Sequence, residues 1–131
     1  MAYWLLKTEP STYSWEDLER EKETRWDGVT APAALQHIRS MKKGDGAVIY
    51  HSGDVRAAIG LAEVTTAPYV DPEADSDRRA VVDLKAVRRL NHPVDLATIK
   101  ASAIFADSPL VRISRLSVVP LTPEQFRTLT R

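Results

Sequence analysis

Three tryptophans, Trp4, Trp15 and Trp26, are the only ones in the chain, and all of them lie within its first 26 residues. An indole has a broad flat face, and aromatic stacking is how proteins hold a nucleobase that has been splayed or flipped out of its strand. Trp4 lies in a short apolar run and Trp15 on a predicted amphipathic helix, so we predict that both are core residues. Trp26 lies in an irregular stretch before the turn signal Asp27-Gly28. Two interpretations of Trp26 stay open: a core side chain, or the wall of a ligand pocket.

The three histidines, His37, His51 and His92, fall in different predicted elements. Metal ligands usually come at short, regular spacings, so these residues do not predict a metal site. His51 is followed by Ser52, but adjacent strand residues point to opposite faces of a sheet, so this pair does not begin a Ser-His-Asp arrangement. The chain has no cysteine, no glycine-rich phosphate loop and no nucleophile elbow. We therefore expect a non-enzymatic protein without a metal or other cofactor.

The charges of the chain balance overall but not locally. There are 18 Lys and Arg against 18 Asp and Glu, a formal net charge of +0 at pH 7, which excludes a polybasic nucleic-acid coat or membrane-surface binder. Residues 61–77 carry five acids and no base, whereas residues 78–131 carry ten bases and four acids. A positive field for an anionic partner is therefore expected mainly from the last third of the chain.

Short strands and helices must position these residues. Apolar runs bounded by Gly, Pro and Asp turns predict strands, and a capping residue before a proline or an acidic first turn predicts the start of a helix. Ser14 is a predicted N-cap, and Thr122 and Gln125 form a predicted capping box. The predicted strands are 3–7, 47–51, 57–65, 80–90 and 114–120. The predicted helices are 14–22, 30–40, 95–101 and one from 122 onward. Residues 67–77 are predicted to form a loop, and residues 102–109 a loop or a helical turn.

The composition is that of one ordinary domain over residues 1–131, with 44% hydrophobic and 27% charged residues. Strands interleaved with short, unequal helices predict an α+β domain around a curved, largely antiparallel sheet. The chain start is apolar for only six residues before Lys7, and no run approaches the roughly 20 apolar residues that span a bilayer. We expect no membrane partner and a cytoplasmic location.

Five blocks of sequence, spread over nearly the whole chain, carry a family resemblance. They are Tyr3-Trp4-Leu5-Leu6-Lys7-Thr8-Glu9-Pro10, Tyr13-Ser14 with Asp17-Leu18, Trp26-Asp27-Gly28-Val29, Tyr50-His51-Ser52, and the stretch from Leu110 to Thr122. In this order they resemble the EVE domain family of the PUA-like superfamily. The resemblance implies a PUA-like pseudo-barrel, a curved and mostly antiparallel sheet flanked by short helices, with a pocket that accepts a modified base from a nucleic acid.

The resemblance also implies which residues form this pocket. Trp26 would be the stacking wall with Val29 beside it, and His51 and Ser52 would supply hydrogen bonds, because polar residues at a buried strand end need partners. The other implied residues are Lys7 and Ser14, which would border the pocket, and Ser114 and Arg115, which would close its other side or meet a phosphate. The basic last third of the chain predicts Arg112 and Arg115 as the phosphate contacts.

Three of these residues have a structural alternative that the sequence leaves open. Ser14 is also suited to a helix cap, Lys7 to an ion pair with Glu9, and Arg115 to an ordinary charge on a sheet face. The family pattern is also broken at one point: after Val29 it usually continues with Arg-Asn and a second Arg-Asn, whereas this chain has Thr30-Ala31. The missing amide at Ala31 could have read a base edge, so the identity of the base stays open.

We therefore predict a non-enzymatic, monomeric reader of a modified nucleobase, on DNA with modified cytosine or on modified RNA. One alternative is a sensor of a free nucleoside or another small molecule in the same pocket. A second is a nuclease or an RNA-modifying enzyme that uses His51 with an acid such as Asp54.

Overall fold

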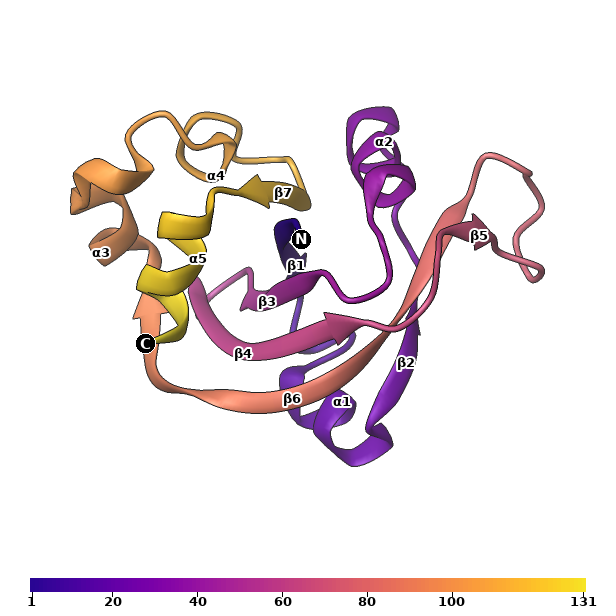
Figure 1. Ribbon diagram of the computed structural model, residues 1–131, viewed down its shortest axis with the longest axis horizontal. Helices are drawn as coiled ribbons and strands as arrows, with labels where there is room; N and C mark the ends of the chain where they lie inside the picture. Colours follow the sequence, from indigo (N-terminus) through magenta and orange to yellow (C-terminus); the bar gives the residue numbers. More distant parts are fainter.

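The computed structural model describes all 131 residues, and a strongly curved sheet forms its centre (Figure 1). The sheet has the strand order β2-β6-β4-β3-β1-β7, and the short β5 pairs with β6 beside this path. The strands are β1 (Tyr3–Thr8), β2 (Glu23–Trp26), β3 (Gly46–His51), β4 (Ala57–Val64), β5 (Tyr69–Val70), β6 (Ala80–Asp95) and β7 (Val118–Leu121). The helices are α1 (Trp15–Glu21), α2 (Pro32–Ser40), α3 (Leu96–Ala101), η1 (Ala103–Phe105), α4 (Pro109–Arg112) and α5 (Pro123–Thr130).

The predicted α+β class and the mostly antiparallel sheet are confirmed. One strand pair is parallel: β1 runs beside β3 with Leu5 opposite Val48. A parallel pair needs a long crossover rather than a tight turn, and here α1, β2 and α2 provide it. This crossover carries its middle residues, Thr24 to Val29, to the end of β1, while Asp45 at its far end lies beside the start of β1.

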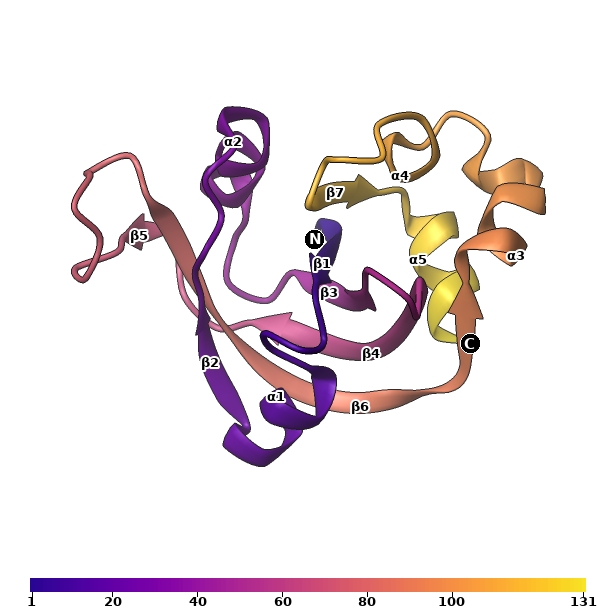
Figure 2. The same ribbon diagram turned by 180° about the vertical axis from the view of Figure 1, so that it is seen from behind.

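The curvature of the sheet comes from the two long strands β4 and β6. Their pairing shifts register between Ala58 and Gly60 and again between Leu61 and Ala62, and such bulges bend a sheet. A Cβ atom on Gly60 would lie 2.4 Å from ring carbons of Trp15, so the absent side chain lets β4 lie directly on the indole. Figure 2 shows the result, a trough with α2 at one end and α3 and α5 at the other.

The core confirms two predictions about the tryptophans. Trp4 and Trp15 belong to a hydrophobic cluster of 32 buried residues. The Trp4 indole donates a hydrogen bond to the Asp45 carboxylate, 3.0 Å away, and this buried carboxylate also accepts bonds from the backbone N–H groups of Ala2 and Lys42. Both predicted helix caps form as capping boxes, Ser14 with Asp17 and Thr122 with Gln125.

The structure corrects three predicted elements. Glu23–Trp26 is a strand that pairs with β6, not an irregular stretch, and its charged sequence gave no apolar alternation to reveal it. The strand from Ala80 continues past Leu90 to Asp95 because its far end pairs with the start of β4. The last strand begins at Val118 rather than Ser114, because the preceding residues form a turn after α4.

Candidate functional site

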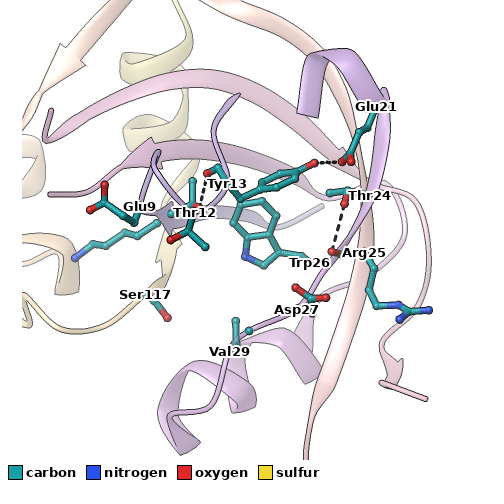
Figure 3. Close-up of a pocket in the computed structure, with 13 residues that line it drawn as sticks. Glu9, Thr12, Tyr13, Glu21, Thr24, Arg25, Trp26, Asp27, Val29 and Ser117 are labelled. Carbon is teal, nitrogen blue, oxygen red and sulfur yellow. Dashed lines mark hydrogen bonds between the residues drawn. The ribbon is translucent and has the colours of Figure 1, made fainter. Parts of the chain in front are cut away.

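A cavity of about 480 Å³ lies where the end of β1, the following loop, the end of β2 and the segment after it meet (Figure 3). We call it the aromatic cavity. It is lined by Lys7, Thr8, Glu9, Thr12, Tyr13, Glu21, Thr24, Arg25, Trp26, Asp27, Gly28, Val29 and Ser117. Its size falls within the range of small-molecule pockets, about 300 to 1,000 Å³.

The alternation of β2 places Trp26 in this cavity. Successive strand side chains point to opposite faces, so Thr24 and Trp26 share one face while Arg25 projects from the other. Figure 3 shows the Arg25 guanidinium directed away from the indole. There it forms ion pairs with Asp71 at 3.2 Å and Glu73 at 2.8 Å. Arg25 therefore holds the acidic loop against the outer side of β2 and leaves the inner side to Trp26.

Trp26 and Tyr13 form the aromatic part of the cavity. Their ring centroids are 6.1 Å apart and their planes make an angle of 84°, an edge-to-face pair. Burial, together with a hydrogen bond from the Tyr13 hydroxyl to the Glu21 carboxylate, raises the pKa of Tyr13 to about 12. The hydrogen bond to Glu21 holds the phenol in place beside the indole.

One hydrogen bond and one glycine turn shape the walls on either side of the rings. The Thr8 hydroxyl donates to the Tyr13 carbonyl at 2.7 Å and so closes the loop between β1 and α1. Gly28 has a φ of 81°, a left-handed conformation that glycine adopts without strain. This turn brings the buried Val29 across the cavity from Trp26, as Figure 3 shows.

Lys7 stands at the edge of the cavity, between it and a second one. Its ammonium donates to the Ser114 carbonyl at 3.0 Å, and burial lowers the pKa of Lys7. It forms no ion pair with Glu9, so that structural alternative is wrong. The aromatic cavity is lined by three acidic residues and two basic ones, and since the Arg25 guanidinium is directed outward, Lys7 is the other basic residue at its wall.

The second cavity, of about 300 Å³, we call the basic cavity. It is lined by Lys7, Tyr50, Ser52, Gly53, Arg56, Leu96, Lys100, Leu110, Val111 and Ser114. The structure thus sorts the predicted site residues into two neighbouring groups. Trp26 and Val29 line the aromatic cavity, Ser52 and Ser114 line the basic cavity, and Lys7 lines both.

Ser14 and His51 line neither cavity, contrary to the expected arrangement, because both hold the start of α1. The Ser14 hydroxyl accepts from the Asp17 N–H at 3.1 Å as the N-cap. The His51 Nε2 accepts a hydrogen bond from the buried backbone N–H of Trp15 at 2.9 Å. Burial lowers the pKa of His51, in keeping with a neutral imidazole that must accept a hydrogen bond.

The two predicted phosphate contacts also lie outside both cavities. The Arg112 guanidinium donates to the Asp107 carboxylate at 2.9 Å and to the Ala106 carbonyl at 3.2 Å. Arg115 is exposed in the turn before β7, so the alternative that it is a sheet-face charge is wrong.

Sequence reasoning did not single out Tyr13, Arg56 and Lys100, which the structure places at the two cavities. Tyr13 stood in a resemblance block, and its position just before the α1 cap could have marked it as a partner of Trp26, because α1 reverses the chain between them. Arg56 and Lys100 belong to separate turns and helices, and no sequence spacing signals that they meet. No group of three or more His, Cys, Asp or Glu side chains is placed to hold a metal ion. No helix is both long and apolar enough to span a membrane.

Comparisons with known proteins match nearly the whole chain to one family. The EVE domain family matches residues 2–131. Human thymocyte nuclear protein 1 is 29% identical, over 95% of this chain and 71% of its own. A solved structure from Rhodopseudomonas palustris is 39% identical with a TM-score of 0.92, covering 99% of this chain and 91% of that one. The structure of human THYN1 in complex with DNA containing 5-methylcytosine is 27% identical with a TM-score of 0.88, covering 99% and 96%. This chain belongs to the EVE domain family.

Proposed function

We propose that the protein reads a modified cytosine in DNA by taking the flipped base into the aromatic cavity, with Trp26 as the stacking wall. The single observation that carries this proposal is the paired Tyr13 and Trp26 rings at a cavity of nucleobase size. The relation to THYN1, whose structure is a complex with DNA containing 5-methylcytosine, supports the choice of ligand.

The cavity offers the contacts that a methylated cytosine requires. The exposed Asp27 carboxylate can accept from the exocyclic amine, the usual partner of an acidic side chain on cytosine. The buried Val29 offers an apolar surface to the 5-methyl group, as side-chain methyls do for the methyl of thymine. Trp26 supplies the stacking face, and stacking on an aromatic side chain contributes about 1–3 kcal/mol per base.

Ser14 and His51 support this site indirectly. They hold the N-terminus of α1, and the residue before Ser14 is Tyr13 itself. Their role in the proposed function is therefore to position Tyr13, whereas Lys7, Trp26 and Val29 contact the base. We also propose that the protein acts as a binding protein rather than as an enzyme, because the Nε2 atom that His51 would need as a base is already used by the Trp15 N–H.

The departure at Ala31 bears on the identity of the base. Ala31 is the N-cap of α2 and provides no side-chain hydrogen bond to the helix. A family amide at this position would add a donor and an acceptor next to the cavity, and this chain must read the base without them. Asp27 is then the main polar reader, which favours a base that presents an amine.

Fluorescence polarisation with a labelled DNA oligonucleotide containing one 5-methylcytosine tests the proposal. Thr12 is exposed and lines the cavity, so Thr12→Tyr fills the site without disturbing the core. We expect Thr12→Tyr to raise the Kd by more than about tenfold, since it blocks base stacking. The control is Ser11→Tyr, the neighbouring exposed residue that lines neither cavity. Equal affinities for both variants and the wild type would show that the base does not enter this cavity.

The same assay separates the alternative ligands. An oligonucleotide is expected to bind more weakly as salt rises, because phosphate contacts release counterions. A sensor of free nucleoside would instead bind 5-methyl-2′-deoxycytidine tightly, with little dependence on salt. An RNA oligonucleotide of the same sequence shows whether the 2′-hydroxyl is tolerated.

A further inference from the structure

The basic cavity is the feature that the proposed function leaves unexplained. It lies next to the aromatic cavity, and the two share Lys7 as a lining residue. The Lys7 ammonium, bonded to the Ser114 carbonyl, lies 6.0 Å from the centre of the Tyr50 ring. A ligand that occupied the aromatic cavity and extended past Lys7 would enter the basic cavity.

Three cations line the basic cavity, Lys7, Arg56 and Lys100, and no acidic side chain does. None of the three forms an ion pair, and the three line one cavity together. Unpaired cations that converge on a cavity without acids create a positive potential that favours an anion. The whole chain has a formal net charge of +0, so the excess of positive charge at this cavity is local.

Three acids lie nearby but form no ion pair with this group. The Glu9 carboxylate lies against Gly53 at the rim of the basic cavity. Asp54 and Asp95 line a separate cavity on the other side of Arg56 and Lys100. The Asp95 carboxylate is used as the N-cap of α3, where it accepts from the Thr98 N–H at 2.8 Å. Arg56 and Lys100 therefore have no carboxylate partner, and no acidic side chain lines the basic cavity beside them.

Tyr50 provides a second, independent indication of a ligand. The residue is only 3% exposed, yet its hydroxyl makes no hydrogen bond within the protein. The only side-chain nitrogen or oxygen that is both fully enclosed and without a partner is the Trp15 Nε1. The Tyr50 hydroxyl is therefore not fully enclosed and can be reached from the cavity. A buried tyrosine usually finds a partner for its hydroxyl, and here the open space beside it is the basic cavity.

The remaining polar groups of the cavity are also suited to an anion. Ser52 and Ser114 contribute hydroxyls that can donate. The Tyr50 hydroxyl, protonated at neutral pH like any ordinary tyrosine, can donate as well. Arg56 is held in place, with a left-handed φ of 52°, its Nε bonded to the Gly53 carbonyl at 3.0 Å and its own carbonyl accepting from the Leu96 N–H at 2.8 Å. Several donors and no acidic acceptor match a phosphate group.

We propose that the basic cavity binds the backbone phosphate next to the flipped nucleotide, through Arg56, Lys100 and the Tyr50 hydroxyl, with Lys7 between base and phosphate. This inference rests on the proposed function, and it assigns the phosphate contact to residues other than Arg112 and Arg115. One phosphate fixed beside the base would set the register of the strand, which phosphate contacts do without reading sequence.

The test compares Arg56→Ala and Lys100→Ala with Lys43→Ala, an exposed turn residue outside both cavities whose loss changes the net charge equally. Affinity for the 5-methylcytosine oligonucleotide is measured at several salt concentrations. We expect each cavity variant to weaken binding several-fold and to reduce the slope of log K against log salt by about 0.7 to 0.9 more than the control. Tyr50→Phe, which removes only the hydroxyl, should weaken binding without changing the slope.

A comparison of nucleoside and nucleotide separates the two proposals. Arg56→Ala should not change affinity for 5-methyl-2′-deoxycytidine but should lower affinity for its monophosphates, whereas Thr12→Tyr should lower affinity for both. If Thr12→Tyr abolishes binding while Arg56→Ala and Lys100→Ala behave as Lys43→Ala does, the phosphate site is wrong and the base cavity stands. If the cavity variants weaken binding and Thr12→Tyr does not, the base cavity is wrong.

Inorganic phosphate tests the basic cavity without any nucleic acid. Titration of the wild type is followed through the amide resonances of Ser52 and Gly53 by NMR. We expect saturable shifts that are lost in the double variant Arg56→Ala Lys100→Ala and kept in Lys43→Ala. The absence of shifts in the wild type, or equal shifts in all three proteins, would overturn the inference.

Discussion

The two cavities that meet at Lys7 differ in what holds their walls. In the aromatic cavity the Tyr13 hydroxyl is bonded to Glu21 and Trp26 belongs to the hydrophobic core. In the basic cavity the Tyr50 hydroxyl is unpartnered, and Arg56 and Lys100 are exposed and unpaired. A site that selects a ligand by shape needs walls fixed by the fold, whereas a site that attracts a charge needs groups left free by it. Substitutions in each cavity test whether the walls of the aromatic cavity are held by the fold and those of the basic cavity are not.

The largest expected difference concerns stability. Trp26 is 6% exposed, and replacing a buried tryptophan by alanine typically lowers the free energy of unfolding by about 3–5 kcal/mol. Lys100→Ala removes an exposed, unpaired side chain and should change it by no more than about 0.5 kcal/mol. Chemical denaturation of both variants measures these values. A Trp26→Ala protein as stable as Lys100→Ala would show that Trp26 is not part of the core, and the distinction between the cavities would fail.

The next prediction concerns the support behind the aromatic cavity. His51→Ala leaves the buried Trp15 N–H without an acceptor and should cost about 1–3 kcal/mol of unfolding free energy. His51→Gln can still accept from that N–H and should recover most of it. Thermal unfolding of both variants and the wild type is compared at about pH 7.5, where His51 of the wild type is mostly neutral in both the folded and the unfolded state. Equal losses would mean that packing, not the hydrogen bond, accounts for the effect.

His51 also predicts a dependence of stability on pH. Burial lowers the pKa of His51 below its ordinary value of 6.5, so the unfolded chain binds the proton more readily than the folded one. Stability from this group is complete above about pH 6.5 and is lost as the pH falls toward the lower pKa of the folded state. Burial also lowers the pKa of His37, which acts in the same direction. Between pH 7 and 5 the wild type should therefore lose more stability than His51→Gln, and equal losses would contradict the assignment.

Much of this arrangement could be predicted from the sequence, and the reasons for the rest are physical. Apolar runs and caps predicted β1, β3, β4 and the helices α1, α2, α3 and α5, because local patterns determine them, whereas α4 was not predicted. β2 was missed since it is an edge strand whose pairing with β6 is decided by tertiary contacts rather than by its own charged sequence. The family resemblance predicted Trp26 and Val29 at a pocket, and both line the aromatic cavity. Arg56 and Lys100 lie far apart in the sequence and come to one cavity only through tertiary folding, so no local pattern predicted them.

A smaller effect should separate the two cavity tyrosines. Glu21→Gln removes the charged partner of Tyr13, so the pKa of Tyr13 should fall from about 12 toward its ordinary value of 10.0 without reaching it, because burial remains. The pKa of Tyr50 is raised by burial with no such partner and should not change. NMR titration of the tyrosine rings measures both. If Tyr50 shifted as much as Tyr13, the cavities would be coupled rather than separately built.

The smallest expected effect is at Arg112. Its guanidinium is exposed, paired with Asp107 and bonded to the Ala106 carbonyl, and it lines neither cavity. Exposed ion pairs contribute about 0–1 kcal/mol, so Arg112→Ala should remain close to the wild type in stability. Its Kd for the 5-methylcytosine oligonucleotide should change by less than about twofold, and its salt slope should match that of Lys43→Ala rather than that of Arg56→Ala. A slope reduced by a full phosphate contact would return Arg112 to the role that the basic last third of the chain predicted. The positive surface would then extend along α4, and the free cations of the basic cavity would be one part of a broader strand path.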